Sequence, residues 1–192
     1  TTWGYGISQT GDPFGFYGPR GIAVSNEGLV FVTDTGNKRV VVFDSQGGYI
    51  TQIGSGGFAP GQFDEPVGIA IDEQGRIYVA DTWNQRVQIL APDGTGSYNP
   101  ERSWDVVGWY GTSLNNYPYI AAREGRVFVT DPEGYRVLEF TDQGEFVRFW
   151  GDYGTTAVDF ALPVGIGIDA QGKIWVVDSA NSRVMAFDLP PE

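Results

Sequence analysis

The amino-acid sequence predicts an all-β protein, a β-propeller made of four-stranded antiparallel blades. One phrase occurs four times: a Gly-Ile-Ala-like run, a turn with Gly, a hydrophobic run that ends in Asp, and then Arg-Val. The Asp positions lie 47, 50 and 47 residues apart, which is a period typical of repeat architectures. These residues are Asp34, Asp81, Asp131 and Asp178. The second observation is that each repeat holds only short strand and turn signals, with no helix signal.

The second repeat shows the strands of one blade most clearly. Residues 68–71 form a short apolar run, and residues 76–81 and 86–90 form β-branched and aromatic runs typical of two further strands. In the first repeat a fourth strand signal follows at residues 49–53. Four short antiparallel strands make one propeller blade, so we expect a single domain over residues 1–192. Its repeats lie near residues 19–54, 66–109, 117–151 and 163–188.

The two ends of the chain predict how the blades are joined. Trp3-Gly4 resembles the close of the fourth strand at Ile53-Gly54, whereas the last repeat reaches only its third strand, near Phe187. We therefore expect residues 1–4 to form the outer strand of the last blade, so that four blades close into a ring without open sheet edges. The alternative is that these are four consecutive blades of a larger propeller.

Composition limits the functions that the chain can have. The formal charge is −12, from 24 acidic and 12 basic residues, which argues against nucleic-acid binding because phosphate contacts depend on Lys and Arg. The chain has no Cys and no His, which excludes disulfides, thiolate chemistry and the commonest general base. It has no apolar run of about 18 residues, so we expect no membrane span.

Two further features concern location. The chain opens with Thr1 rather than Met, and its acidic composition includes only two lysines. From these features we expect an extracellular or cell-surface protein. We also expect the chain to be part of a larger chain or assembly.

The repeated motifs resemble those of the NHL repeat family. They are Gly-Ile-Ala, Val-Thr/Ala-Asp, Asn-x-Arg-Val and, in three copies, a Phe that follows this Val by three residues. Residues 34–40, 81–87 and 178–184 carry the fuller phrase. The third copy has Gly134 in place of Asn and lacks Gly-Ile-Ala, so we expect its inner strand to be irregular. The resemblance implies a propeller, usually of six blades, and related propellers include lactonases and lyases.

The repeated Asp, Asn and Arg side chains could hold a substrate, but a set that recurs in nearly every blade is untypical of a catalytic site. The turn between the second and third strands needs polar side chains to bind free backbone amides, and Arg can pair with Asp nearby. We therefore interpret the set as framework. Asp131 and Arg136 persist where Asn is lost, as a framework pair would.

The candidate site lies where the repeat is broken. In an antiparallel four-stranded blade, the linkers between blades and the turns between the second and third strands emerge on one face, which we call the linker face. We expect it to present aromatic rings with Asn and Arg beside them, which suits a peptide or a sugar ring. The candidate binding residues are Tyr17, Arg20, Trp83, Trp109, Tyr110, Asn115, Asn116, Tyr117 and Tyr135. Residues expected to fill the space between blades instead are Phe14, Phe58, Phe63 and Phe160.

The function expected from these features is a non-enzymatic binding or scaffold module that presents the linker face to a protein, peptide or glycan and uses no cofactor. The alternative is a calcium-dependent hydrolase or lyase, with the ion held on the propeller axis by carboxylates from several blades. Calcium needs only oxygen ligands, so the lack of His and Cys leaves this alternative open.

Overall fold

The structure is a computed structural model that describes residues 2–6, 12, 14–109 and 117–188. It is all-β, which confirms the predicted class. Helical geometry in the described residues is limited to two single 3-10 turns, η1 (Thr35–Asn37) and η2 (Ser179–Asn181), at the Asp-Asn motifs of the first and last repeats. None of the described helices has the length and apolar character needed to cross a membrane.

Each repeat forms one antiparallel sheet, with four strands in the first three repeats. The first blade consists of β3 (Pro19–Val24), β4 (Val30–Asp34), β5 (Arg39–Phe43) and β6 (Tyr49–Ile53). The second consists of β7 (Pro66–Ile71), β8 (Ile77–Asp81), β9 (Arg86–Pro92) and β10 (Tyr98–Asp105). The third consists of β11 (Ile120–Arg123), β12 (Arg126–Asp131), β13 (Arg136–Thr141) and β14 (Phe146–Trp150). The fourth consists of β15 (Pro163–Ile168), β16 (Ile174–Asp178) and β17 (Arg183–Phe187).

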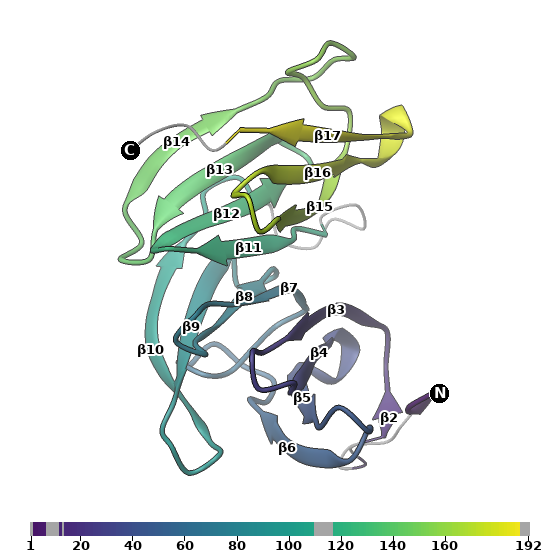
Figure 1. The fold of residues 1–192 in the computed structure, drawn as a ribbon, viewed down its shortest axis with the longest axis vertical. Coiled ribbons are helices and arrows are strands. Elements are labelled where there is room, and N and C mark those ends of the chain that lie inside the picture. The colour runs from purple at the N-terminus through teal and green to yellow at the C-terminus, as the bar shows by residue number, and fades with distance from the viewer. Residues whose placement is uncertain (1, 7–11, 13, 110–116, 189–192) are drawn as a thin grey trace.

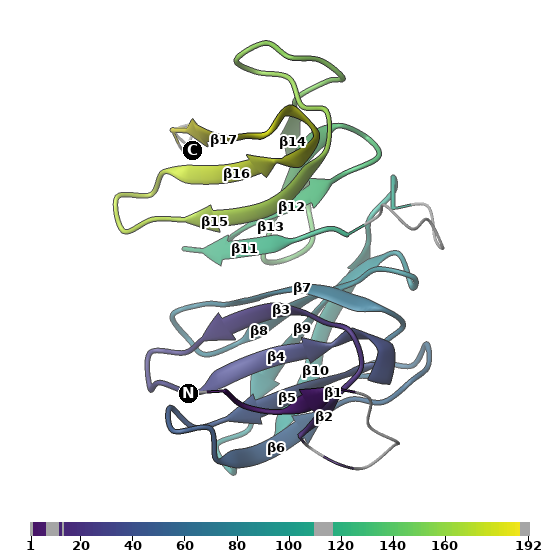
Figure 2. The ribbon, with the colours of Figure 1, turned by 90° about the vertical axis from the view of Figure 1, so that its right-hand side faces the viewer.

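The blades follow one another in an arc, with the first blade at one end and the fourth at the other (Figure 1). The inner strands β3, β7, β11 and β15 lie in sequence along this arc (Figure 2). Threonine hydroxyls join some of them: Thr33 Oγ1 donates to Val67 O at 2.7 Å, and Thr130 Oγ1 donates to Val164 O at 2.9 Å. The second strand of one blade thus holds the inner strand of the next.

The hydrophobic core lies between blades. At each interface, the second and third strands of one blade pack against the first three strands of the following blade. A linker aromatic with an exposed fraction of 0% belongs to each interface, namely Phe63, Trp109 and Phe160. The predicted filling role is therefore confirmed for Phe63 and Phe160.

The closed four-bladed ring is not formed. Trp3 packs against Phe43 of the first blade, with ring centroids 6.1 Å apart, and in the described residues β17 pairs only with β16. The expectation that the N-terminal strand completes the last blade is therefore wrong for residues 2–4. The physical reason is that Val41 and Phe43 give Trp3 an apolar surface on the first blade.

Two short strands precede the first blade, where β1 (Tyr5–Gly6) pairs in parallel with β2 (Gly15–Phe16). Phe14 and Phe16 pack against the Phe43 ring, with centroids 6.0 Å from it. This cluster contains described residues of the first blade and the segment before it only, so the structure does not place Phe14 between two blades as predicted. The third inner strand is irregular, as expected. It has four residues where the other inner strands have six, and it pairs without the register shift that they share.

Candidate functional site

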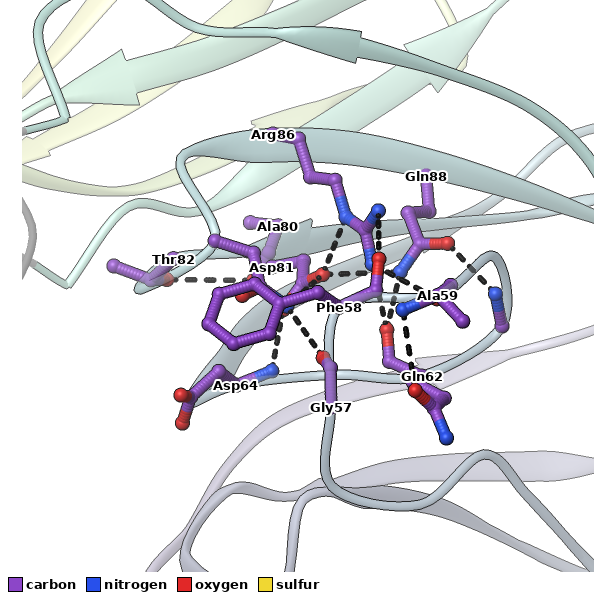
Figure 3. Close-up of polar contacts among 12 residues, drawn as sticks. Gly57, Phe58, Ala59, Gln62, Asp64, Ala80, Asp81, Thr82, Arg86 and Gln88 are labelled. Carbon is purple, nitrogen blue, oxygen red and sulfur yellow. Dashed lines mark hydrogen bonds and ion pairs between the residues drawn. The ribbon is translucent and has the colours of Figure 1, made fainter.

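The Asp81 carboxylate is the centre of a buried polar network at the linker face of the second blade (Figure 3). Its exposed fraction is 0%. Oδ2 accepts hydrogen bonds from Asn84 Nδ2 at 2.9 Å, Arg86 Nε at 2.8 Å and Gln88 Nε2 at 3.0 Å, and Oδ1 accepts one from the backbone N–H of Asp64 at 2.6 Å. A buried carboxylate is stable only when it is paired and hydrogen-bonded in this way.

The same Asn and Arg side chains hold the linker that precedes the blade. Asn84 Nδ2 donates to Gly57 O at 2.9 Å, and the Arg86 guanidinium donates to Phe58 O, Ala59 O and Gln62 O at 2.9 to 3.2 Å. These bonds satisfy linker carbonyls that no strand partner can reach. The motif therefore fixes the backbone of the linker, which supports the framework interpretation.

These hydrogen bonds from the motif Asn and Arg to the linker carbonyls form what we call the clamp. The first and fourth copies of the motif have the same clamp, and the third departs from it. Asn37 Nδ2 donates to Gly15 O at 3.2 Å, and Asn181 Nδ2 donates to Gly154 O at 2.8 Å. In the third copy Gly134 takes the place of Asn, and among the described residues Arg136 hydrogen-bonds only to Asp131, through Nε at 2.8 Å. The third linker thus lacks the Asn contribution to its clamp.

Asp81 and Asp178 occupy equivalent places but titrate differently. Burial raises the pKa of Asp81 above its ordinary value, although hydrogen bonds from a backbone amide and from the motif Asn and Arg oppose the shift. Burial acts in the same direction on Asp178, but there two backbone amides and the motif side chains outweigh it, and the pKa is lowered. Both carboxylates are fully buried, but the second blade is covered on both faces and the fourth on one, so desolvation acts more strongly on Asp81.

Beside this clamp a cavity of about 450 Å³ opens on the linker face. Its lining residues include Phe58, Trp83, Asp105 and Val107. Phe58 is 75% exposed, Trp83 37% and Val107 83%. The exposure that we predicted for Trp83 is confirmed, whereas the filling role predicted for Phe58 is wrong, because Phe63 already fills the interface below it.

Asp105 gives this cavity a negative charge. It is exposed, and no described side chain or backbone amide donates to its carboxylate. Asp105 was not among the predicted site residues, because it ends β10 and has no sequence feature that distinguishes it from an ordinary strand residue. Its place beside Trp83 depends on pairing between β9 and β10, which brings Asp105 opposite Arg86.

Tyr135 belongs to a second aromatic group on the linker face. Its ring meets that of Tyr153 edge to face, with centroids 4.9 Å apart. Tyr153 comes from the following linker and is 70% exposed. Tyr135 also has a φ of +55°, a left-handed conformation that is uncommon outside glycine and that the tight turn imposes.

Arg20, Tyr117 and Tyr17 lie near the start of inner strands. The Arg20 guanidinium carbon is 3.7 Å from the centroid of the Tyr117 ring, a cation–π contact that joins the first blade to the third. The Tyr119 hydroxyl also donates to Arg20 O at 3.2 Å. Tyr17 is 61% exposed, and its backbone N–H donates to Asp34 Oδ1 at 2.7 Å.

The other predicted site residues do not add to these groups. Trp109 is fully buried, and its indole N–H donates to Thr130 O at 3.2 Å, so the expectation that it is accessible to a ligand is wrong. The reason is that Trp109 fills the space between the second and third blades. Tyr110, Asn115 and Asn116 lie outside the described residues.

In the described part of the chain, no three Asp, Glu, His or Cys side chains come together in a way that could hold a metal ion. The calcium site of the alternative function therefore has no candidate ligand set among these residues.

Comparisons with known proteins agree with the fold. A family model described as 6-bladed beta-propeller (DUF5128) matches residues 9–124, and an NHL repeat model matches residues 160–187. NHL repeat-containing protein 3 from Homo sapiens is 29% identical over 92 residues, which are 42% of this chain and 26% of that protein. The chain thus spans about a quarter of the length of the curated relatives it matches.

Two solved structures are similar to this chain in fold. A catalytically inactive virginiamycin B lyase from Staphylococcus aureus with quinupristin has a TM-score of 0.59 and 18% identity, over 91% of this chain and 56% of that chain. An auxiliary nutrient binding protein from Bacteroides thetaiotaomicron has a TM-score of 0.63 and 15% identity, over 86% of this chain and 46% of that chain. At these identities the likeness concerns the fold alone.

Proposed function

The chain belongs to the 6-bladed beta-propeller family DUF5128 and carries NHL repeats, and from this premise we propose that it is a non-enzymatic binding scaffold whose linker face holds a protein partner. The proposed partner presents an Arg or Lys side chain between apolar residues. The proposal needs no cofactor. An extracellular or cell-surface location and the absence of nucleic-acid binding stay predictions from composition.

The observation that carries the proposal is the cavity beside Phe58, Trp83 and Asp105. Exposed aromatic rings offer a large contact area at small cost in side-chain entropy, which is why they are enriched in binding sites. A carboxylate beside aromatic faces favours a cation, which forms an ion pair with the former and cation–π contacts with the latter. The net charge of −12 also attracts a basic partner from a distance.

The clamp around Asp81 supports the same proposal through rigidity. Arg86 and Asn84 hold the backbone carbonyls of residues 57–59, so Phe58 projects from a fixed linker. A cavity with fixed walls binds with a smaller loss of conformational entropy than a mobile loop. The framework motif and the binding cavity therefore act together.

Selection from a phage-displayed peptide library on the purified chain tests the proposal. Enriched peptides should combine Arg or Lys with apolar residues, and calorimetry should give a lower affinity at high salt. Trp83→Ala should raise the Kd of the best peptide by about 30-fold, as for an interface hot spot. Asp105→Asn should weaken the salt dependence.

Tyr49→Ala is the matched control, because Tyr49 is also an exposed aromatic, at 39%, but lies on the outer strand β6 of the first blade. Its Kd should equal that of the unaltered chain. Peptides that bind Trp83→Ala as tightly as the unaltered chain would contradict the proposed site. Binding of oligosaccharides but not peptides would favour a glycan partner, and binding only with calcium, lost with a chelator, would favour the alternative function.

A further inference from the structure

The cavity beside Trp83 adjoins a second cavity of about 390 Å³. The two cavities have Asp105 and Val107 in common among their lining residues, and both of these residues are exposed. The other walls of the second cavity belong to β13, β14 and the turn between them. We call the two cavities together the junction groove, because they lead from the second blade to the third. One elongated ligand can therefore occupy both.

The second cavity is mainly apolar. Phe146 and Phe149 are 56% and 53% exposed, and they lie beside the buried side chains of Leu138 and Phe140. The Phe146 ring meets the Phe140 ring edge to face, with centroids 5.7 Å apart. Exposed aromatic rings that rest on a packed core offer a fixed apolar surface, and other aromatic rings pack well against them. This cavity therefore suits an aromatic side chain of a partner.

Arg136 gives the second cavity a positive charge. Its Nε donates to Asp131 Oδ2 at 2.8 Å, and its guanidinium carbon lies 5.2 Å from the centroid of the Phe149 ring. In the second and fourth copies of the motif, the terminal nitrogens of Arg86 and Arg183 donate to carbonyls of the preceding linker. Those of Arg136 donate to no described residue. Within the described structure, the guanidinium is thus fixed at one edge and keeps its terminal N–H donors for a ligand.

Two glycines make room for this guanidinium. Gly134 stands where the other copies have Asn, and a Cβ there would overlap Asp131 Oδ2 and lie 2.9 Å from Arg136 Nε. A Cβ at Gly108, which lines the first cavity, would lie 2.9 Å from Arg136 Nη2. Arg136 therefore lies where the two cavities meet. The change from Asn to Gly134 removes one part of the clamp and accommodates the present Asp131–Arg136 pair.

Asp105 and Arg136 carry opposite charges in the same groove, but they do not neutralise each other. Arg136 forms its ion pair with Asp131, and none with Asp105. The carboxylate lies beside Trp83, and the guanidinium lies beside Phe149. A groove of this kind is complementary to a ligand with the reversed charge order, because a cation pairs with the carboxylate and a second carboxylate pairs with the guanidinium.

We propose that the junction groove binds one continuous segment of a protein partner through three groups. An Arg or Lys side chain occupies the first cavity, an aromatic side chain occupies the second, and a carboxylate pairs with Arg136. The inference rests on the proposed function, since the basic side chain is the one assigned there to Trp83 and Asp105. The carboxylate belongs either to an Asp or Glu side chain or to the end of a chain, and both have the same chemistry.

A panel of synthetic peptides tests the proposal by fluorescence anisotropy. Fluorescein-labelled, C-terminally amidated peptides of about ten residues carry one Arg, one Phe and one Glu beside the Phe in a Gly-Ser background, in both orders and with varied spacing. In the tightest peptide, replacement of Phe by Ala should raise the Kd about tenfold. Replacement of Glu by Gln should raise it about fivefold.

A second series of peptides identifies the source of the carboxylate. These peptides carry no Glu and end in Phe with a free carboxylate, and their amidated forms serve as controls. Weaker binding of the amidated form would support the proposal with a chain end as the source, and weaker binding of the Gln peptide in the first series would support it with a side chain. Loss of neither effect on binding, that is, no difference in either series, would overturn the role of Arg136.

Variants of the chain assign each peptide side chain to its cavity. In Phe146→Ala the Phe and Ala peptides should bind about equally, whereas the preference for Arg should remain. In Trp83→Ala the preference for Arg should fall by about tenfold or more, whereas that for Phe should remain. Tyr49→Ala, with an exposed ring on the outer strand β6, should change neither preference. The carboxylate is tested in the peptide because Arg136 holds the buried Asp131, and its replacement would disturb the fold.

The outcomes separate this inference from the proposed function. An unchanged preference for Phe in Phe146→Ala, or equal binding of the Phe and Ala peptides to the unaltered chain, would overturn the inference and leave the proposed function standing wherever Arg still strengthens binding. Peptides that bind equally well without Arg would contradict both. A panel without any peptide of Kd below about 1 mM would overturn the inference, and selection from the phage library decides on the proposed function separately.

Discussion

The second and fourth blades carry the same motif in the same strand order, yet they bury their strands differently. In β8 all five residues are buried, whereas β16 buries every other residue. The equivalent side chains Tyr78 and Trp175 are 1% and 45% exposed. Both faces of β8 meet a neighbouring blade, and only one face of β16 does. The difference teaches that the neighbouring blade, and not the strand sequence, determines burial in this fold.

The largest effect in this comparison is expected at the inner-strand glycines. Gly68→Ala places a methyl group 2.6 Å from the Tyr119 backbone, so we expect a loss of about 3 kcal/mol in the free energy of unfolding. Gly165→Ala meets only a movable Val177 methyl, and we expect a change within about 0.5 kcal/mol of zero. Urea denaturation of the two variants measures both values. Equal losses would show that the equivalent glycines have equivalent surroundings.

A smaller difference is expected between Val87 on β9 and Val184 on β17, which occupy equivalent positions in the third strands of their blades. Val87→Ala removes two buried methyl groups from a fully covered position and should cost about 2 kcal/mol of stability. Val184→Ala changes a side chain that is 61% exposed and should cost less than about 0.5 kcal/mol. Thermal denaturation followed by circular dichroism provides the comparison. A large loss for Val184→Ala would mean that this valine is covered in solution.

The smallest difference between the two blades is expected in how pH changes the stability that Asp81 and Asp178 contribute. The pKa of Asp81 is raised in the folded chain, so its contribution to stability is present below the unfolded pKa and is lost as pH rises through the folded pKa. The pKa of Asp178 is lowered, so its contribution is present above the unfolded pKa and is lost as pH falls through the folded pKa.

The two Asn variants should therefore respond to acid in opposite directions. Between about pH 7 and about pH 3, the loss of stability caused by Asp178→Asn should shrink, and the loss caused by Asp81→Asn should grow. Urea denaturation at a series of pH values measures both trends. Parallel trends would contradict the opposite directions of the two pKa shifts.

The candidate site was predicted in part. Trp83 was selected from the sequence because it stands in a turn where the first and fourth copies have the small residues Gly36 and Ala180. Its exposure at this turn does not depend on distant contacts. Phe58 was predicted to fill the space between blades and Trp109 to be exposed, and both predictions are wrong. Both residues are linker aromatics near glycines, and nothing in the local sequence distinguishes a ring that points into the interface from one that points to solvent. In the second linker Phe63 fills the interface and leaves Phe58 outside, whereas in the third linker Trp109 itself fills it.

The sequence by itself determined the blades and their clamps, because strand alternation, turn glycines and the Asp-Asn-Arg hydrogen bonds act within one repeat of about 47 residues. Only the tertiary structure decided where Trp3 packs, which linker ring is exposed, and that the first and fourth blades do not meet. These outcomes depend on apolar contacts between residues that belong to different repeats. Such contacts are non-directional, so equivalent sequences can be buried in one blade and exposed in another.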